Sequence, residues 1–178
     1  MSKNGLILLT PTSISSNSGL STINPNGSIS VVSDQYLRIN GLFSADYDNY
    51  MVVSRINVTS LRSYSVRMAV GSAIDGGTNY WSEYMWADGS TVGAARYNQS
   101  RFVFPSYNTS ASGSIFYFYG PYLEQPTAAR AIGVDSRNDC YLNDAAATHT
   151  QSVSYDGLYF YDTTQPMTGT IAVYGMRK

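Results

Sequence analysis

Apolar and polar residues alternate along much of this chain with a period of two, which is the pattern of a half-buried β-strand. Over residues 50–58, five alternate positions fall on one face: Tyr50, Val52, Ser54, Ile56 and Val58. Over residues 62–70, one face carries Tyr64, Val66, Met68 and Val70, and the opposite face carries Arg67. Helical periodicity is almost absent, so both segments are predicted to be antiparallel strands.

The rest of the chain is predicted to form further short strands, at Gly5–Thr10, Ser28–Val32, Tyr36–Asn40, Tyr80–Ala87, Arg96–Phe104, Ser114–Tyr119, Ala129–Val134, Cys140–Leu142, Gln151–Ser154, Gly157–Tyr161 and Gly169–Met176. Turn pairs such as Asp88-Gly89 and Asp156-Gly157 separate these strands, because their residues tolerate a positive φ. Many short strands joined by such turns predict an all-β fold, either a sandwich or a barrel. We expect one domain over residues 1–178, with the Ser/Asn-rich stretch 12–26 as a surface loop or flexible arm.

Two of the predicted strands are apolar or aromatic on both faces. They are Ile115–Tyr119 and Gly157–Tyr161, where Tyr159 and Tyr161 point away from Leu158 and Phe160. Only one face of a strand in a sandwich meets the core, so the other must be covered by a neighbouring subunit, a ligand or the chain's own loops.

Composition bears on the kind of partner. Charged residues make up only 13% of the 178 residues, the net charge is −1, and tyrosine occurs 16 times. Lysine occurs only near the two ends, and every other cation is arginine. This composition is typical of protein interfaces, although strand-rich proteins also favour tyrosine. No basic patch or charge run is present, so neither nucleic acid nor membrane is an expected partner.

The aromatic and arginine residues supply the candidate site. Trp81 and Trp86 lie on opposite faces of one predicted strand, so at least one of them belongs to the core. Tryptophan and tyrosine rings suit stacking on sugar rings as well as on protein. The candidate subunit-interface or ligand-facing residues are Tyr117, Tyr119, Tyr159, Tyr161, Trp81, Trp86 and Arg67.

No constellation typical of a cofactor, metal or catalytic site is found. His149 is the one histidine and is expected to be structural, and Cys140 is the one cysteine, expected to be buried in a strand. Asp75–Thr78 is interpreted as a hairpin tip. Paired carboxylates such as Glu83 and Asp88 would suit a glycosidase, but most acidic residues occur in turn-like contexts, so no enzyme activity is expected.

An ordered set of short motifs resembles the short β-rich virion structural proteins of tailed bacteriophages, including cyanophage-type and other marine phage examples. The motifs are Leu9-Thr10-Pro11-Thr12-Ser13-Ile14, Asn26-Gly27-Ser28-Ile29-Ser30-Val31, Leu37-Arg38-Ile39-Asn40-Gly41-Leu42-Phe43-Ser44, Tyr47-Asp48-Asn49-Tyr50-Met51-Val52-Val53, Tyr155-Asp156-Gly157-Leu158 and Gly169-Thr170-Ile171-Ala172-Val173-Tyr174-Gly175. Each motif alone is weak, but together they span nearly the whole chain in order.

The resemblance implies a jelly-roll-like β-sandwich, a homotrimer, and a place on the surface of a virion assembled in the host cytoplasm. Its members look like capsid decoration (cement) proteins, which contact the major capsid protein, or tail-fibre and receptor-binding domains that recognise host surface glycans. It implies no catalytic residues and no cofactor. The predicted strands run almost from end to end of the chain and leave no room for a fibre anchor, so capsid decoration is the expected role, with stretch 12–26 as a clamping arm.

Overall fold

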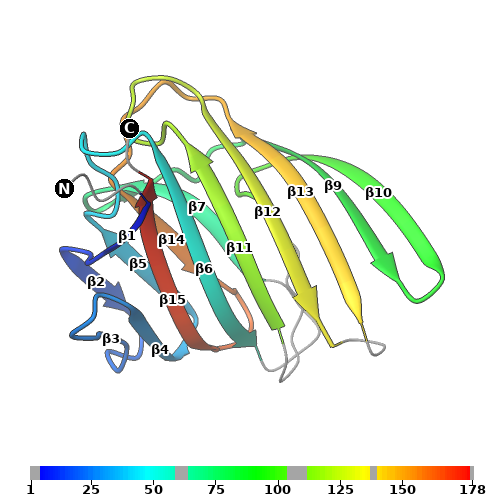
Figure 1. The fold of residues 1–178 in the computed structure, drawn as a ribbon, viewed down its shortest axis with the longest axis horizontal. Coiled ribbons are helices and arrows are strands. Elements are labelled where there is room, and N and C mark those ends of the chain that lie inside the picture. Colours follow the sequence, from blue (N-terminus) through cyan, green and yellow to red (C-terminus); the bar gives the residue numbers. More distant parts are fainter. Residues whose placement is uncertain (1–4, 59–63, 104–111, 137–139, 177–178) are drawn as a thin grey trace.

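The computed structural model describes residues 5–58, 64–103, 112–136 and 140–176, and all regular structure among them is β-strand (Figure 1). The strands form two sheets in which every pairing is antiparallel, and the two sheets pack face to face. The fold is therefore the jelly-roll-like antiparallel β-sandwich that was predicted. No helix that could cross a membrane is found in the described ranges.

The larger sheet, called sheet A here, has ten strands. They are β1 (Leu6–Leu9), β3 (Thr22–Ile23), β4 (Ile29–Asp34), β6 (Asn49–Val58), β9 (Tyr80–Asp88), β10 (Thr91–Gln99), β11 (Ser112–Tyr119), β12 (Thr127–Asp135), β13 (Tyr141–His149) and β15 (Met167–Met176). Their order across the sheet is β10-β9-β13-β12-β11-β6-β15-β4-β3, and β1 pairs with the C-terminal half of β15.

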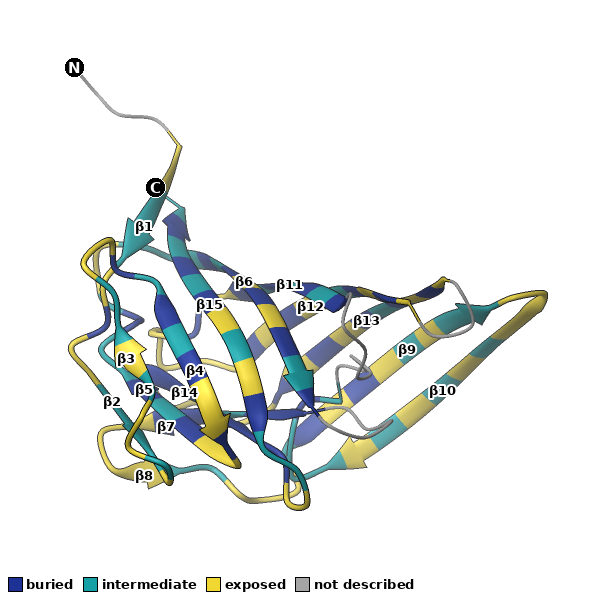
Figure 2. Ribbon diagram, turned by 90° about the horizontal axis from the view of Figure 1, so that it is seen from below, coloured by how far each residue is buried: buried dark blue, intermediate teal, exposed yellow. Residues whose placement is uncertain are grey.

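The smaller sheet, called sheet B here, has five strands. They are β2 (Ser13–Ser16), β5 (Tyr36–Asn40), β7 (Ser65–Val70), β8 (Ala73–Ile74) and β14 (Gly157–Tyr161). Their order is β2-β5-β14-β7-β8. Because sheet A has twice as many strands, β9 and β10 extend beyond the strands of sheet B (Figures 1 and 2). No residue of β10 is fully buried.

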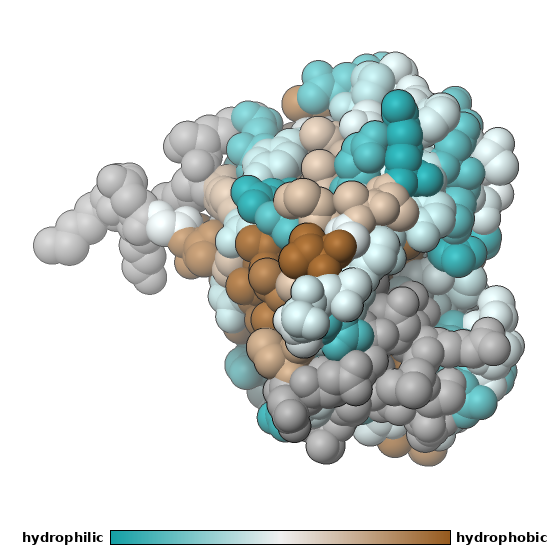
Figure 3. Space-filling view, turned by 90° about the vertical axis from the view of Figure 1, so that its right-hand side faces the viewer, coloured by the Kyte–Doolittle hydropathy of each residue, from teal (hydrophilic) through white to brown (hydrophobic). Residues whose placement is uncertain are grey.

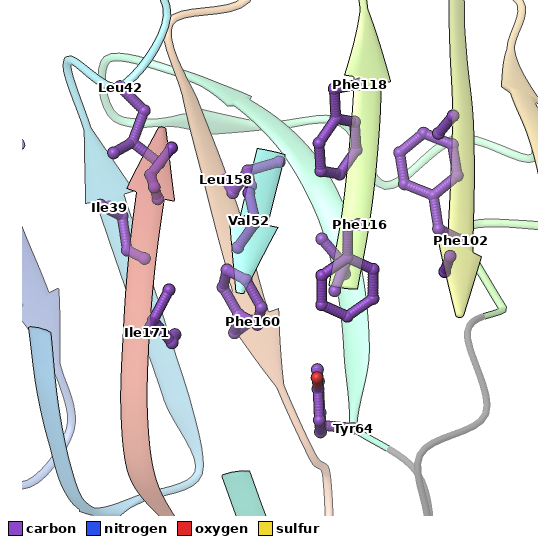
Figure 4. Packing of buried hydrophobic residues seen from close by; sticks show 14 of the residues in the cluster. Ile39, Leu42, Val52, Tyr64, Phe102, Phe116, Phe118, Leu158, Phe160 and Ile171 are labelled. Atoms are coloured by element: carbon purple, nitrogen blue, oxygen red, sulfur yellow. The ribbon is translucent and has the colours of Figure 1, made fainter. Parts of the chain in front are cut away.

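The core fills the space between the sheets and follows the alternation in the sequence. All five alternate residues of β6, from Tyr50 to Val58, are buried, as predicted. Phe116 and Phe118 of sheet A pack towards Leu158 and Phe160 of sheet B (Figure 4). Burial of such a side chain contributes about 1.5–3 kcal/mol, so this shared aromatic core holds the two sheets together.

Several predicted strands differ from the observed ones. The stretch 12–26, expected as an arm or loop, contains β2 and β3, which pair with β5 and β4 and so tie it to both sheets. The strand predicted at Gln151–Ser154 is absent, since these residues link β13 to β14 and Ser154 Oγ donates to the Tyr122 carbonyl. The strand predicted at Arg96–Phe104 is β10 and begins five residues earlier; Phe104 lies outside the described residues, as do Arg62 and Ser63 at the start of another predicted strand.

The region around Cys140 also departs from expectation. Cys140 is exposed and precedes β13, so the prediction that it is a buried strand residue is wrong. The strand predicted to end at Leu142 continues to His149. Its extension is rich in alanine, and pairing with β12 on one side and β9 on the other holds it in the sheet. Tertiary pairing here overrides weak intrinsic strand propensity.

Candidate functional site

The outer face of sheet A, which points away from sheet B, carries a group of exposed apolar side chains. The exposed fractions are 78% for Val92, 59% for Met85, 50% for Val134 and 46% for Leu142. Smaller or less exposed apolar residues fill the positions between them. We define the outer patch as Met85, Ala87, Val92, Ala94, Ile132, Val134 and Leu142.

Strand register makes the outer patch continuous. Val134 lies opposite Leu142, Leu142 opposite Ala87, and Ala87 opposite Val92, which gives one apolar row across four strands. Neighbouring strands are about 4.8 Å apart, so side chains in such a row touch. A hollow of about 250 Å³ lies along this row and includes Met85, Val92 and Leu142 in its lining. Figure 3 looks onto this end of the molecule, where hydrophobic atoms gather near the centre.

The charged groups beside the outer patch are neutralised by one another. Arg130 donates from Nε to Asp144 Oδ1 at 3.1 Å and from Nη2 to Asp144 Oδ2 at 2.6 Å. The Asp144 carboxylate raises the pKa of the Arg130 guanidinium. Arg96 Nε lies 3.1 Å from Glu83 Oε1. The face therefore presents paired charges around an apolar centre, which is the arrangement found at protein interfaces.

A row of small side chains between two aromatic rings lies further along the same face. Tyr119 lies opposite Ala128, Ala128 opposite Thr148, and Thr148 opposite Trp81. Trp81 is 40% exposed, and the guanidinium carbon of Arg96 lies 4.9 Å from its ring centroid. A hollow of about 390 Å³ follows Trp81, Ala128 and Thr148.

The outer face of sheet B holds Tyr159, Tyr161 and Arg67 together. Tyr159 stacks on Tyr161 with ring centroids 5.2 Å apart, and the Arg67 guanidinium lies 4.6 Å from the Tyr161 ring centroid. Arg67 also donates from Nε to the Ser100 carbonyl at 2.7 Å and from Nη2 to Ser100 Oγ at 3.0 Å. Tyr161 is buried, and Tyr36 also stacks with Tyr159, with ring centroids 5.9 Å apart.

Trp86 points to the inner face of sheet A, away from Trp81, at the end of the sheet that sheet B does not reach. Its ring stacks with Tyr84, which also stacks with Tyr97. The indole lies across Gly93, since a Cβ on Gly93 would come within 2.0 Å of Trp86 Cζ2. The structure thus divides the predicted candidates into three groups: Tyr117, Tyr119 and Trp81 on the outer face of sheet A; Tyr159, Tyr161 and Arg67 on that of sheet B; and Trp86 on the inner face of sheet A. Trp86 is only partly buried and lies outside the hydrophobic core, so the expectation that one of the two tryptophans belongs to the core is wrong.

The single histidine, which was expected to be structural, lies in the interior of the fold. His149 is fully buried against the rings of Tyr80 and Tyr155, and its Nε2 lies 2.7 Å from Asp75 Oδ2. Burial lowers the pKa of His149, although the bond to Asp75 acts in the opposite direction. Burial alone would raise the pKa of Asp75, but hydrogen bonds from the Gly77 N–H and His149 bring it below its usual value.

The Asp75–His149 contact corrects the interpretation of Asp75–Thr78 as a hairpin tip. The segment instead links β8 of sheet B to β9 of sheet A, and Asp75 anchors it by donating from its N–H to the Met68 carbonyl at 3.1 Å. No metal-binding cluster is found among residues that the structure describes. Glu83 and Asp88 lie on opposite faces of β9, so this pair does not converge on a common substrate.

Comparisons with known proteins identify no family for this chain. No protein-family model matches the chain, and no curated protein matches it. Among solved structures, the SPRY domain of human HERC1 aligns at 8% identity over 90% of this chain and 99% of that chain, with a TM-score of 0.33. Lectin I from Ulex europaeus aligns at 5% identity over 94% of this chain and 93% of that chain, with a TM-score of 0.25.

Sequence reasoning missed most of the outer patch. Alternation in β9 puts Met85 on the same face as Trp81, but Val92, Val134 and Leu142 belong to strands that meet only in the folded sheet. The signal that was available is the apolar character of alternate positions in Val92–Ala94 and Ile132–Val134. It could be read only once the register across β12, β13, β9 and β10 was known.

Proposed function

We propose that this chain is a non-enzymatic structural subunit that attaches to another protein of a larger assembly through the outer face of sheet A. The observation that carries this proposal is the continuous outer patch, whose largest members, Met85, Val92, Val134 and Leu142, are exposed in the isolated chain. Contiguous apolar patches on soluble proteins mark interaction sites, because leaving them in water is unfavourable. A partner that covers them gains hydrophobic free energy of about 25 cal/mol per Å².

The charge pattern indicates what kind of partner fits. Arg130 and Arg96 are each paired with a carboxylate of the same face, so neither presents an uncompensated positive charge to a phosphate group. An apolar centre with a neutralised rim suits a protein surface of low charge. Tyr117 and Tyr119 continue this face towards β11 and would extend the contact.

The finer form of the proposal assigns the chain to the particle surface of a tailed bacteriophage, as a capsid decoration protein that binds the major capsid protein. It is supported by the ordered sequence motifs that resemble virion structural proteins. A compact sandwich with one bare sheet face is compatible with a subunit seated on a lattice. A homotrimer on the particle remains part of this proposal.

Cryo-electron microscopy of the parent particle tests the proposal. We expect density for this chain on the capsid, with the outer face of sheet A turned towards the shell. Density confined to the tail would contradict the decoration role, and an outer patch facing solvent would contradict the contact face.

A matched pair of variants tests the contact face in solution. Val92→Glu places a charge on the outer patch, and Val70→Glu places the same charge on an exposed valine of sheet B. When each is added to particles that lack the protein, we expect Val92→Glu to lose binding and Val70→Glu to retain it. Equal binding by both variants would contradict the proposed face.

Glycan recognition is a second candidate, favoured by the Trp81–Tyr119 row. The two aromatic residues are three strand spacings apart, about 14 Å, with small side chains between them. Such a row offers two stacking platforms for a chain of sugar units. Trp81→Ala would then abolish binding in a glycan screen and leave the fold intact, whereas Trp86→Ala, on the inner face, serves as the control. A screen without any glycan that binds would count against this function.

A further inference from the structure

The two sheets have edges of very different length in the described part of the chain. At one side of sheet A the outermost strands are β1 and β3, of four and two residues, and sheet B ends in β2 and β8, of four and two residues. The opposite edge of sheet A is β10, with nine residues. Natural proteins shorten or cover their edge strands because a free edge is a template for another strand. β10 is the exception in this molecule.

The edge of β10 also lacks the usual protection. It contains neither proline nor lysine, and it pairs one-to-one with β9 from Thr91 to Gln99 without a bulge. Its single charge, Arg96, is turned back onto its own sheet by Glu83 and the Trp81 ring. Three consecutive small residues, Gly93, Ala94 and Ala95, lie at its centre. A second backbone can therefore approach this edge closely.

The turn at Gly89 shows which backbone groups point outward. Gly89 has a φ of 57° at the first position of the two-residue loop, as a type II′ hairpin turn requires. Asp88 and Thr91 are then a hydrogen-bonded pair, and every second residue from Thr91 bonds to β9. The N–H and C=O groups of the intervening residues, Ala94 among them, face away from the sheet.

We propose that β10 pairs with β10 of a second copy of this chain, antiparallel about a two-fold axis at Ala95. In this register Gly93 lies opposite Tyr97 of the second copy, and Ala95 lies opposite Ala95. The Trp86 ring already lies across Gly93 and reaches towards the edge. The stacked Tyr84, Trp86 and Tyr97 rings of the two copies thus form one aromatic row on the inner face.

The same register keeps like charges from facing each other, because Arg96 lies opposite Ala94 of the second copy. The self-complementary fit of glycine against tyrosine, and of arginine against alanine, is what favours a second copy over a different partner. The pairing uses the edge of sheet A and is independent of the proposed function, which uses its face. A two-fold contact gives dimers, so it is also distinct from the homotrimer that the resemblance implies.

Sedimentation of the purified chain tests the pairing. We expect the wild type at micromolar concentration to sediment at twice the 19.5 kDa of one chain. Ala94→Pro removes an outward N–H without removing a bond to β9, so it should sediment as a monomer, whereas Ala94→Thr, which keeps the N–H, should remain a dimer. A monomeric wild type, or a dimer that survives Ala94→Pro, would overturn the proposal.

Disulfide cross-linking tests the register without relying on the fold of the proline variant. In a Cys140→Ser background, Ala95→Cys places two thiols directly opposite each other, with Cβ atoms about 5 Å apart. Thr91→Cys places the two thiols about 27 Å apart, given about 3.4 Å per residue along each strand. We expect mild oxidation to cross-link Ala95→Cys and not Thr91→Cys. Equal cross-linking of both variants, or none at Ala95→Cys, would overturn the proposed pairing.

Discussion

The outer faces of the two sheets have similar sequence patterns but different surroundings. Both carry aromatic and arginine residues at alternate positions. On sheet B, Arg67 covers Tyr161 and is held by Ser100, a residue from the segment that follows β10. On sheet A, Arg96 and Arg130 pair with acids of the same face and leave Met85, Val92 and Leu142 exposed. An apolar strand face can thus be covered by the chain itself or left for a partner, and only the fold distinguishes the two.

The largest effect should come from a tyrosine on the covered face. Tyr161→Ala removes a side chain that is only 8% exposed and breaks its contacts with Tyr159 and Arg67. We expect a loss of about 2–4 kcal/mol in the free energy of unfolding, measured by urea denaturation. Tyr119→Ala, at 42% exposure on sheet A, should cost less than about 1 kcal/mol. Similar losses from both variants would remove the distinction between the faces.

Arginine substitutions should also destabilise the protein more on the face of sheet B than on that of sheet A, but with smaller losses of stability than the tyrosine substitution. Arg67→Met removes two hydrogen bonds to Ser100 and the contact with the Tyr161 ring, so we expect a loss of about 1–2 kcal/mol. Arg130→Met removes an exposed ion pair with Asp144, which solvent screens, so we expect no measurable change in stability. Thermal unfolding of both variants measures the difference. A larger loss from Arg130→Met would reverse our assignment of the covered and uncovered faces.

Lowering the pH should reduce the free energy of unfolding by a smaller amount, through the histidine buried between the two sheets. Burial holds the pKa of His149 below its ordinary value of 6.5, so the unfolded chain binds more protons as the pH falls below 6.5, and folding loses stability. Neutral His149 donates from Nε2 to Asp75, and its Nδ1 has no partner among the described residues, so protonation would bury an unpaired donor.

Urea midpoints between pH 7.5 and pH 5 measure this loss. His149 is the one histidine of the chain, so it is the one side chain whose ordinary pKa lies in that window. His149→Phe should remove most of the slope. A wild-type midpoint that stays constant or rises on acidification would contradict the buried, neutral state.

The smallest effect on stability is expected from the most exposed member of the outer patch. Val92→Thr keeps the β-branched shape at a side chain that is 78% exposed, so the free energy of unfolding should change by less than about 0.5 kcal/mol. Binding to the assembly should nevertheless weaken, because a hydroxyl replaces apolar area in the contact. Denaturation and a binding titration of the same sample separate the two readouts. A loss of stability with unchanged binding would indicate that Val92 supports the fold instead.

The limits of sequence-based prediction follow from the same residues. β5 and β14 begin and end as predicted, at Tyr36–Asn40 and Gly157–Tyr161, because each is a short apolar or aromatic run with a turn pair at one end, Asn40-Gly41 or Asp156-Gly157. The end of β13 was missed because Ala145–Ala147 has no pattern of its own and depends on pairing with β12 and β9. Local pattern therefore predicts individual strands and the sandwich class, but not the strands that their neighbours stabilise.

The candidate site was predictable only in part. Trp81 and Tyr119 were identified from composition and alternation, and both lie on the uncovered face. Trp81 and Tyr119 share this face with Val92, Val134 and Leu142 because of the register between strands that are far apart in sequence. No local pattern in the sequence encodes that register. The contact between Asp75 and His149, 74 residues apart, was hidden for the same reason.

Methionine labelling of the intact particle tests the central claim most directly. Met85 is 59% exposed on the outer face of sheet A, and Met68 is fully buried in the core as an internal reference. In the isolated chain, oxidation should reach Met85 rapidly and Met68 slowly. In the assembled particle we predict that Met85 becomes strongly protected, while Tyr36 on the outer face of sheet B remains open to radical labelling. Met85 oxidised as fast in the particle as in the free chain would contradict the account.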